Sequence, residues 1–245
     1  MVDRQFADAS LAEWYDLFCA WPGRGDFTFY FPLVMSARSV LDAGCGTGLL
    51  LRRARQAGHP GRLHGLDPAA AMLDIARKQP GIDWTEGDLG AVTWDREFDL
   101  IIMTGHAFQV LLTDEEIHTA LTTVRAALTP DGLFAFETRN PAAREWENWT
   151  PGNAREVTNP SGTTMRVAHQ VLSVNEDRVH FSATYTMPAW SEPKISHSTL
   201  RFPDAAQVGT FLTTAGLTIT AQYGDWDRTP LTASSPEIIT LARSG

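Results

Sequence analysis

The amino-acid sequence predicts an α/β fold with a doubly wound, mainly parallel sheet and an inserted antiparallel β-sheet. Apolar strand-like runs alternate with helical patterns from Val40 to Glu137, as expected for parallel strands joined by crossover helices. A glycine-rich turn follows the first run, and an acid ends the second. From Pro141 to Pro203 the helix-length periodicity is lost, apart from a short stretch over 142–148, and strand-like segments replace it. The sequence therefore predicts one core interrupted by a β-rich insertion.

The elements can be justified in order from the N-terminus. Apolar residues recur at helical spacing from Ser10 to Trp21, a Pro-Gly-Arg-Gly turn over 22–25 ends that helix, and an aromatic-rich pattern resumes over 26–35. Crossover helices are predicted over 49–57, 69–78 and 114–128. Thr113 caps the last of these, and acids fill its first turn.

The insertion and the final core elements follow. Enrichment in Val, Thr, Tyr and Phe predicts inserted strands over 163–174, 178–188 and 195–202. A helix is predicted over 204–215, and strands over 217–223 and 238–243. The core therefore covers 38–140 and 203–245, and the insertion covers 141–202.

The glycine-rich turn and the acid after it predict a nucleoside-binding site. Residues 40–48 read Val-Leu-Asp-Ala-Gly-Cys-Gly-Thr-Gly, and glycine lets the backbone pass close beneath a ligand. Asp67 ends the next strand about 20 residues on, the spacing that places a carboxylate at a ribose diol. A dinucleotide fingerprint needs a small residue where Leu49 stands. That departure, and the lack of a Tyr-x-x-x-Lys pair, disfavour a nicotinamide oxidoreductase.

Composition narrows the classes of partner. The 245 residues carry a formal net charge of −9 and show no Lys/Arg stripe, which argues against a nucleic-acid partner. Cys19 and Cys45 are the only cysteines, so no disulfide framework is implied. The N-terminus lacks the apolar core of a signal peptide, and no run approaches membrane-spanning length. We expect a cytoplasmic protein with no membrane partner, and the scattered histidines predict no metal site.

Further segments follow the glycine turn in a fixed order along the sequence, and together they resemble a known family. They are Asp67-Pro68 with Met72, the sequence Trp-Thr-Glu-Gly-Asp-Leu over 84–89, the strand and loop over 98–109, and the turn and strand over 128–137. Over these residues the chain resembles the class I S-adenosylmethionine (SAM)-dependent methyltransferases. The resemblance implies a Rossmann-like sheet of seven strands with the seventh antiparallel. It also implies SAM as cofactor and S-adenosyl-L-homocysteine (SAH) as product.

The resemblance assigns residues to this cofactor. Asp67 would bind both ribose hydroxyls, Met72 would lie under the adenine, and Asp88 would accept a hydrogen bond from the adenine amino group. The N-terminal helices, residues 1–37, would fold over the cofactor as a lid. Tyr15 and Tyr30 would lie near the methionine end, or else pack the lid. The predicted SAM site comprises Tyr15, Tyr30, Asp42, Gly44, Gly46, Asp67, Pro68, Met72, Gly87, Asp88, Leu89 and Thr104.

His106 is the candidate catalytic residue. It stands two residues after Thr104, in the loop that borders both the methionine moiety and the substrate in this family, and imidazole titrates near neutrality. A hydroxyl acceptor needs such a general base more than a neutral amine does. Alternatively, His106 orients SAM or caps the following helix. Candidate substrate residues are Gln109, Arg139, His169, Tyr185 and Arg201.

The insertion follows the fifth strand and would emerge at the ligand-binding edge of the sheet. It could roof the pocket, form a homodimer interface, or do both. Bacterial small-molecule methyltransferases, including sugar N-methyltransferases of antibiotic pathways, often carry such an insertion. The resemblance therefore implies transfer of a methyl group to the O, N or C atom of a small molecule of secondary metabolism.

One alternative function belongs to a different class of protein. It is a SAM-binding protein that transfers no methyl group, either a cyclase-like enzyme or a regulatory module. Methylation of protein or RNA lacks support, because the fourth strand runs into Thr-Gly-His-Ala rather than an Asn-Pro-Pro-Tyr-like motif.

Overall fold

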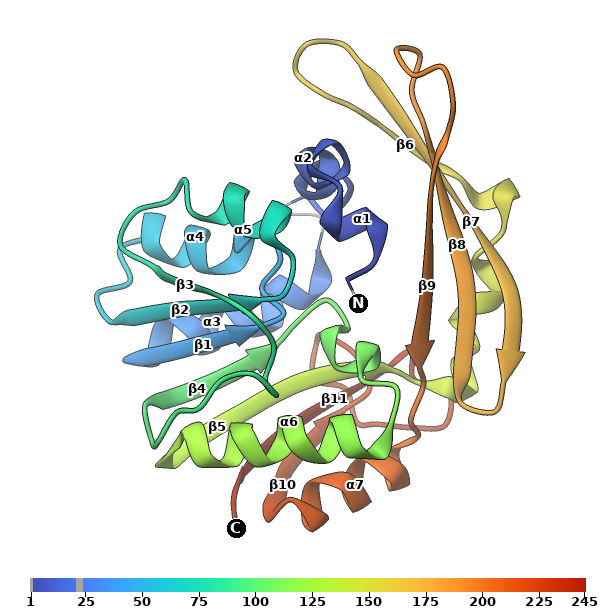
Figure 1. Ribbon diagram of the computed structural model, residues 1–245. Helices are drawn as coiled ribbons and strands as arrows, with labels where there is room; N and C mark the ends of the chain where they lie inside the picture. The colour runs from blue at the N-terminus through green and yellow to red at the C-terminus, as the bar shows by residue number, and fades with distance from the viewer. Residues whose placement is uncertain (1, 21–23) are drawn as a thin grey trace.

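The computed structural model describes residues 2–20 and 24–245, and a seven-stranded sheet forms its centre (Figure 1). The strands are β1 (Ser39–Ala43), β2 (Arg62–Asp67), β3 (Asp83–Glu86), β4 (Phe98–Met103), β5 (Leu128–Arg139), β10 (Leu217–Tyr223) and β11 (Glu237–Ser244). Their order is β10-β11-β5-β4-β1-β2-β3, and β11 runs antiparallel to both neighbours. The predicted sheet with an antiparallel seventh strand is confirmed. The predicted helix end at Trp21 and the turn residues 22–23 lie outside the described residues.

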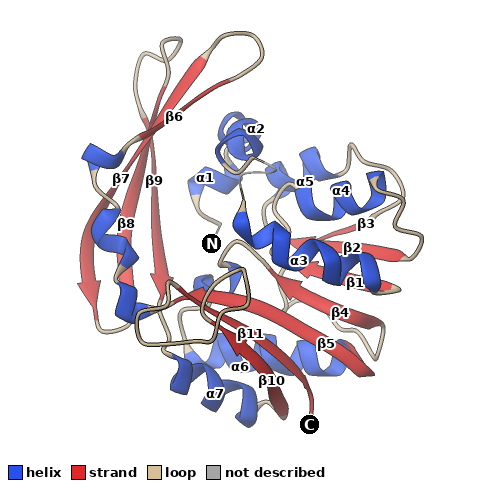
Figure 2. Ribbon diagram, turned by 180° about the vertical axis from the view of Figure 1, so that it is seen from behind, coloured by secondary structure: helices blue, strands red, loops and turns tan. Residues whose placement is uncertain are grey.

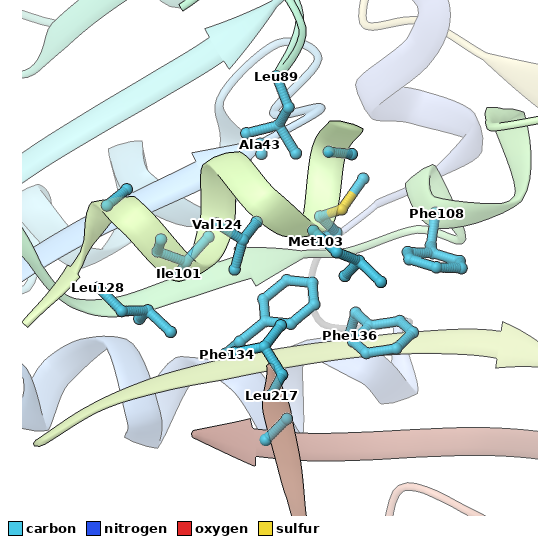
Figure 3. Close-up of a cluster of buried hydrophobic side chains, with 14 of the residues drawn as sticks. Ala43, Leu89, Ile101, Met103, Phe108, Val124, Leu128, Phe134, Phe136 and Leu217 are labelled. Atoms are coloured by element: carbon cyan, nitrogen blue, oxygen red, sulfur yellow. The ribbon is translucent and has the colours of Figure 1, made fainter. Parts of the chain in front are cut away.

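Helices cover both faces of this sheet (Figure 2). They are α3 (Gly25–Ser36), α4 (Leu49–Gln56), α5 (Ala70–Ala76), α6 (Asp114–Ala127) and α7 (Ala205–Thr214). Because successive strand residues point to opposite faces, Ile101 packs toward α6, whereas Leu100 and Ile102 pack toward α3 and α4. Figure 3 shows the α6 side, where Phe134 and Phe136 stack with ring centroids 4.7 Å apart. None of the described helices is long and apolar enough to cross a bilayer.

The core helices begin and end within about two residues of the predicted positions, as expected where periodicity is strong. Thr113 caps α6 as predicted: its Oγ1 accepts from Glu116 N–H at 3.1 Å, and the Glu116 carboxylate accepts from Thr113 N–H at 2.8 Å. One detail differs. Leu128, predicted as the last residue of a helix, is the first residue of β5. The turn predicted after it is an irregularity within β5, where the register of its pairing with β4 shifts.

A separate four-stranded antiparallel sheet is inserted between β5 and α7 (Figure 1). Its strands are, in spatial order, β6 (Arg155–Thr158), β7 (Thr164–Asn175), β8 (Arg178–Thr186) and β9 (Lys194–Arg201). The predicted inserted sheet is confirmed, but β6 was missed because four residues give no readable alternation. Three 3-10 turns precede β6, and the short helical stretch expected over 142–148 is broken where Arg144 adopts φ 50°.

The N-terminal helices lie between the two sheets (Figures 1 and 2). They are α1 (Arg4–Ala7) and α2 (Ala9–Phe18). On the core side, Asp16 accepts a hydrogen bond from Thr47 Oγ1 and pairs with Arg52. On the other side, Lys194 of β9 pairs with Asp8 at 2.8 Å. This segment therefore bridges the core and the inserted sheet.

Candidate active site

A cavity of about 460 Å³ lies at the carboxyl ends of β1, β2 and β4. The core side of its lining includes Gly44, Gly46, Asp67, Pro68, Met72, Gly87, Asp88, Leu89, Thr104 and His106. The N-terminal helices add Phe6 and Tyr15. The insertion and its approach add Arg139, Glu145, Trp149, Arg155, His169, Phe181 and Leu200. Most of the predicted SAM-site residues therefore share one cavity with His106, Arg139 and His169.

Of the three glycines in the turn, Gly46 is the one whose side-chain position is open to the cavity. All three have positive φ, 81° at Gly44, 55° at Gly46 and 69° at Gly48, a region that favours glycine. A Cβ on Gly44 would lie 2.7 Å from a neighbouring side chain, and one on Gly48 would lie 2.2 Å from the Trp84 ring. A Cβ on Gly46 would meet only Tyr15, at 3.9 Å. A side chain at Gly46 would therefore occupy ligand space.

Gly46→Ala and Gly48→Ala should fail in different ways. Gly48→Ala adds a clash with Trp84 to a left-handed backbone, so we expect a loss of about 3 kcal/mol in unfolding free energy. Gly46→Ala should lose only about 1–2 kcal/mol and stay folded, yet its methyl group should lower affinity for SAM about tenfold. Thermal denaturation and calorimetric titration separate the two effects. Wild-type SAM affinity in folded Gly46→Ala would contradict this assignment.

Asp67 ends β2 and holds the glycine turn in place. Its carboxylate accepts hydrogen bonds from the backbone N–H of Gly46 at 2.7 Å and of Ala69 at 2.8 Å. Burial raises the pKa of Asp67, while these two N–H groups act to lower it. A carboxylate has more acceptor positions than these two donors use, so Asp67 can serve a ligand as well as the turn.

Residues after β3 form the next part of the wall. Asp88 Oδ1 accepts from Gly90 N–H at 2.9 Å, which fixes the carboxylate within its loop. Met72 and Leu89 are buried apolar residues that line the same cavity. An acceptor beside an apolar slot suits a purine with an exocyclic amine.

A smaller cavity of about 30 Å³ adjoins the glycine turn, and Tyr15, Arg24, Asp42 and Thr104 are among its lining residues. Asp42 is 1% exposed, its Oδ1 has no hydrogen-bond partner, and burial raises its pKa to about 8. A buried oxygen without a donor is costly, so this one fits an N–H or ammonium group of a ligand. Arg24, which pairs with Asp26, was missed because its only sequence signal was a lone cation between two helices.

His106 follows β4 and contacts two carboxylates that the sequence analysis did not place in the site. Glu137 Oε1, on β5, accepts from His106 backbone N–H at 2.7 Å, and the other oxygen accepts from Tyr30 Oη. Glu237, the first residue of β11, lies 3.0 Å from His106 Nε2. Because β11 runs antiparallel, its first residue meets the carboxyl edge of the parallel strands. An acid directly before the predicted strand over 238–243 was the available signal for Glu237.

The buried carboxyls beneath the cavity should make stability fall as pH rises. Burial, with a further contribution from neighbouring acids, raises the pKa of Asp42 to about 8, of Glu137 to about 7 and of Glu237 to about 9. A raised folded-state pKa adds stability that is complete below the unfolded-state pKa and is lost as pH rises through the folded-state value. We expect the melting temperature without ligand to fall between about pH 5 and about pH 9. Glu137→Gln should flatten the fall, and an equally steep fall in this variant would contradict the assignment.

Gln109 and Arg201, both predicted to touch substrate, instead tie the inserted sheet to the core. Gln109 Nε2 donates to the Arg201 carbonyl at 2.7 Å. The Arg201 guanidinium pairs with Asp177 at 2.6 Å and with Asp114 at 2.7 Å. Neither Gln109 nor Arg201 lines the cavity, because these bonds commit their polar groups to anchoring.

Two predicted tyrosines also lie outside the cavity lining. Tyr30 is fully buried below it and donates to Glu137. Tyr185 donates to Gln5 Oε1 at 3.0 Å and packs edge-on against Phe18. Burial raises the pKa of both phenols. In the structure Tyr30 is therefore linked to the site through Glu137, and Tyr185 joins the inserted sheet to α1 and α2.

The insertion side of the cavity is aromatic. The Trp149 and Phe181 rings lie 4.7 Å apart between centroids, and His169 lies 6.1 Å from Phe181. Arg139 places its guanidinium 5.3 Å from the Trp149 centroid and pairs with Glu145 at 2.5 Å. Burial, helped by nearby arginines, lowers the pKa of His169, so it is a neutral group near pH 7. Among the described residues, no cluster of His, Cys, Asp or Glu is arranged to hold a metal ion.

Comparison with known proteins agrees with these features. A family model described as a methyltransferase domain matches residues 40–132. The chain is 28% identical to the cypemycin N-terminal methyltransferase of a Streptomyces species, over 98% of each chain. It is 33% identical to a dTDP-3-amino-3,6-dideoxy-α-D-glucopyranose N,N-dimethyltransferase of Streptomyces fradiae. That match covers 54% of this chain and about half, 51%, of the relative.

Solved structures share the whole architecture. DesVI of Streptomyces venezuelae has a TM-score of 0.72 at 22% identity, covering 96% of this chain and 98% of that one. SAM-bound CalS10 of Micromonospora echinaspora has a TM-score of 0.71 at 20% identity, covering 95% and 97%. At these identities the likeness shows the fold. Together, the family match over residues 40–132, the named relatives and this shared fold support a SAM-dependent methyltransferase.

Proposed function

We propose that the protein transfers the methyl group of SAM to a small-molecule acceptor of secondary metabolism, and that His106 accepts the proton that the acceptor loses. The observation that carries this proposal is a single cavity that joins the predicted SAM residues to an aromatic wall, with His106 in its lining. A volume of about 460 Å³ lies in the usual range for small-molecule sites.

The lining side chains suggest how SAM would lie. Asp67 would accept from the ribose hydroxyls and Asp88 from the adenine amino group, with Met72 against the ring. Asp42 would meet the ammonium group and Arg24 the carboxylate of the methionine end. SAM, when bound, supplies an activated methyl group on a sulfonium. The remaining task of the chain is to align the acceptor and remove its proton.

The aromatic wall favours an acceptor with a flat or ring-shaped body. Trp149 and Phe181 offer ring faces and edges for stacking, and Leu200 adds apolar surface. The names of the relatives above specify an N-terminus and an amino sugar. Amines and hydroxyls on ring-shaped molecules are therefore the first acceptors to test.

Trp149→Ala should separate acceptor binding from cofactor binding. Loss of a ring from the wall should raise the acceptor KM about tenfold, while the Kd for SAM stays within about twofold. Trp146→Ala is the matched control, because Trp146 packs on Phe202 and does not line the main cavity. Steady-state kinetics and titration measure both quantities. An unchanged acceptor KM together with weakened SAM binding would contradict the proposal that Trp149 binds the acceptor and not the cofactor.

We assign a role to each segment accordingly. Residues 38–140 and 203–245 hold SAM, residues 1–37 act as a lid, and residues 141–202 bind the acceptor. Asp16 on α2 contacts Thr47 of the core, and Asp8 contacts Lys194 of the inserted sheet. These contacts support the assignment, because the lid can open only by breaking its contact with the core or its contact with the inserted sheet.

An acceptor screen tests the proposed function. Purified protein is incubated with SAM and panels of aromatic amines, amino sugars and phenols, and SAH and methylated product are measured by mass spectrometry. We expect SAH release that depends on an acceptor of these classes. SAH release only with a protein or RNA would contradict the proposal. SAM consumption without a methylated product would support the non-methylating alternative.

A further inference from the structure

His106 is held at two separate points, its backbone N–H and its imidazole ring. Glu137 accepts its backbone N–H at 2.7 Å, and both carboxylate oxygens of Glu237 lie 3.0–3.1 Å from its Nε2. Glu137 is fully buried and Glu237 is 8% exposed. Two carboxylates on neighbouring strands, β5 and β11, therefore fix both the backbone and the ring of one residue.

The backbone at His106 is one that a non-glycine residue avoids. Its φ is 64°, and Gly105 before it has φ 67°. The left-handed region costs an L residue about 1–2 kcal/mol, and such strain collects at functional sites. The hydrogen bond from His106 N–H to buried Glu137 offsets that cost and sets the direction of the side chain.

The ring nitrogens of His106 have different surroundings. Nε2 is engaged by Glu237, whereas Nδ1 has no hydrogen bond to any described residue. His106 lines the main cavity and Glu237 does not. Nδ1 is therefore the ring nitrogen that the described residues leave without a partner, and Glu237 can act on a ligand in the cavity only through the imidazole.

Charged and titratable groups approach His106 from each packed element. They are Glu237 on β11, Glu137 and Arg139 on β5, Arg24 before α3, and Tyr30 on α3 through Glu137. Burial, together with Arg139 and Arg24, lowers the pKa of His106 well below its ordinary value, and burial raises the pKa of Glu237 to about 9. Groups this close titrate as a pair. Once the imidazole is neutral and Glu237 has ionised, the carboxylate accepts from Nε2–H and the Nδ1 lone pair is free.

We infer that Glu237 is the positioning residue for methyl transfer, holding Nε2–H so that Nδ1 takes the proton of the acceptor. This inference rests on the proposed function. The acceptor lone pair forms the new bond to the methyl carbon, and the sulfonium sulfur keeps the electrons of the broken C–S bond. The acceptor proton moves to His106 Nδ1, and the Glu237 carboxylate stabilises the imidazolium that results.

Nitrogen NMR of the imidazoles tests this inference without an identified acceptor. Full-length protein with ¹⁵N-histidine is titrated with and without SAH, and His106 is assigned by the signals that disappear in His106→Gln. In the wild type we expect an Nε2–H tautomer with unprotonated Nδ1 at high pH. In Glu237→Gln the His106 midpoint should fall by at least about one pH unit, because the carboxylate that stabilises the protonated ring is gone. Glu97→Gln, a carboxylate that pairs with Arg62, should leave that midpoint unchanged.

Two results would overturn the inference: the same His106 midpoint in the wild type and Glu237→Gln, or Nδ1–H as the neutral tautomer of both. If Glu237→Gln does not fold, Glu237→Asp replaces it. That variant keeps the charge but draws it back by one methylene, and should lower the midpoint by a smaller amount. Failure of the wild type to bind SAH would count against the proposed function instead, and the NMR comparison without SAH would still decide the role of Glu237.

Discussion

Asp67→Ala is expected to weaken SAM binding by at least about two orders of magnitude. The variant removes the carboxylate that we propose accepts two hydrogen bonds from the ribose hydroxyls, each worth about 1.5–3 kcal/mol. Tenfold in affinity corresponds to about 1.4 kcal/mol. The variant also leaves the Gly46 and Ala69 N–H groups without the carboxylate that they bond in the structure. Calorimetric titration with SAM measures the loss.

Two further variants serve as an intermediate case and a control for Asp67→Ala. Asp67→Asn keeps the size of the side chain but not its charge, so its affinity should fall between those of the wild type and Asp67→Ala. Asp74→Ala removes a carboxylate on α5 that is 75% exposed, and it should bind SAM normally. Wild-type affinity in a folded Asp67→Ala protein would mean that the ribose site is placed wrongly.

His106→Ala is expected to slow methyl transfer about 10²–10⁴-fold, the usual contribution of a general base. The effect should be largest for a hydroxyl acceptor, which needs the base most. SAM affinity should stay within about twofold, because the side chain is proposed to act on the acceptor proton. Single-turnover kinetics and titration with SAM measure the two effects separately.

His118→Ala is the matched control for His106→Ala, because His118 lies on the exposed side of α6. Its rate should equal that of the wild type. If His106→Ala loses SAM binding and shows no separate kinetic defect, His106 orients the cofactor instead. That outcome was the alternative left open by the sequence.

The parts of the site that could be predicted are those encoded by local spacing. Gly46 and Asp67 lie 21 positions apart, and the hydrogen bond between them closes one strand-turn-helix-strand unit. The spacing of such a unit is fixed by the lengths of its elements, so sequence alone predicts that the two residues lie together. The same argument predicted the crossover helices, whose periodicity is clear over several turns.

The parts that could not be predicted depend on contacts between distant segments. Gln109 and Arg201 are 92 positions apart, and their residue types do not reveal that they bind one another rather than a substrate. His106 and Glu237 are 131 positions apart. Only the reversal of β11 brings Glu237 to the ligand edge, so the acid was visible in the sequence but its neighbour was not.

Calorimetric titration of the wild-type protein with SAM, SAH and NADH tests the central claim most directly. The account predicts that SAM and SAH bind at one site and that NADH does not, because the cavity offers carboxylates and a glycine turn rather than a dinucleotide cradle. Binding of NADH, or failure of the folded protein to bind either SAM or SAH, would contradict it.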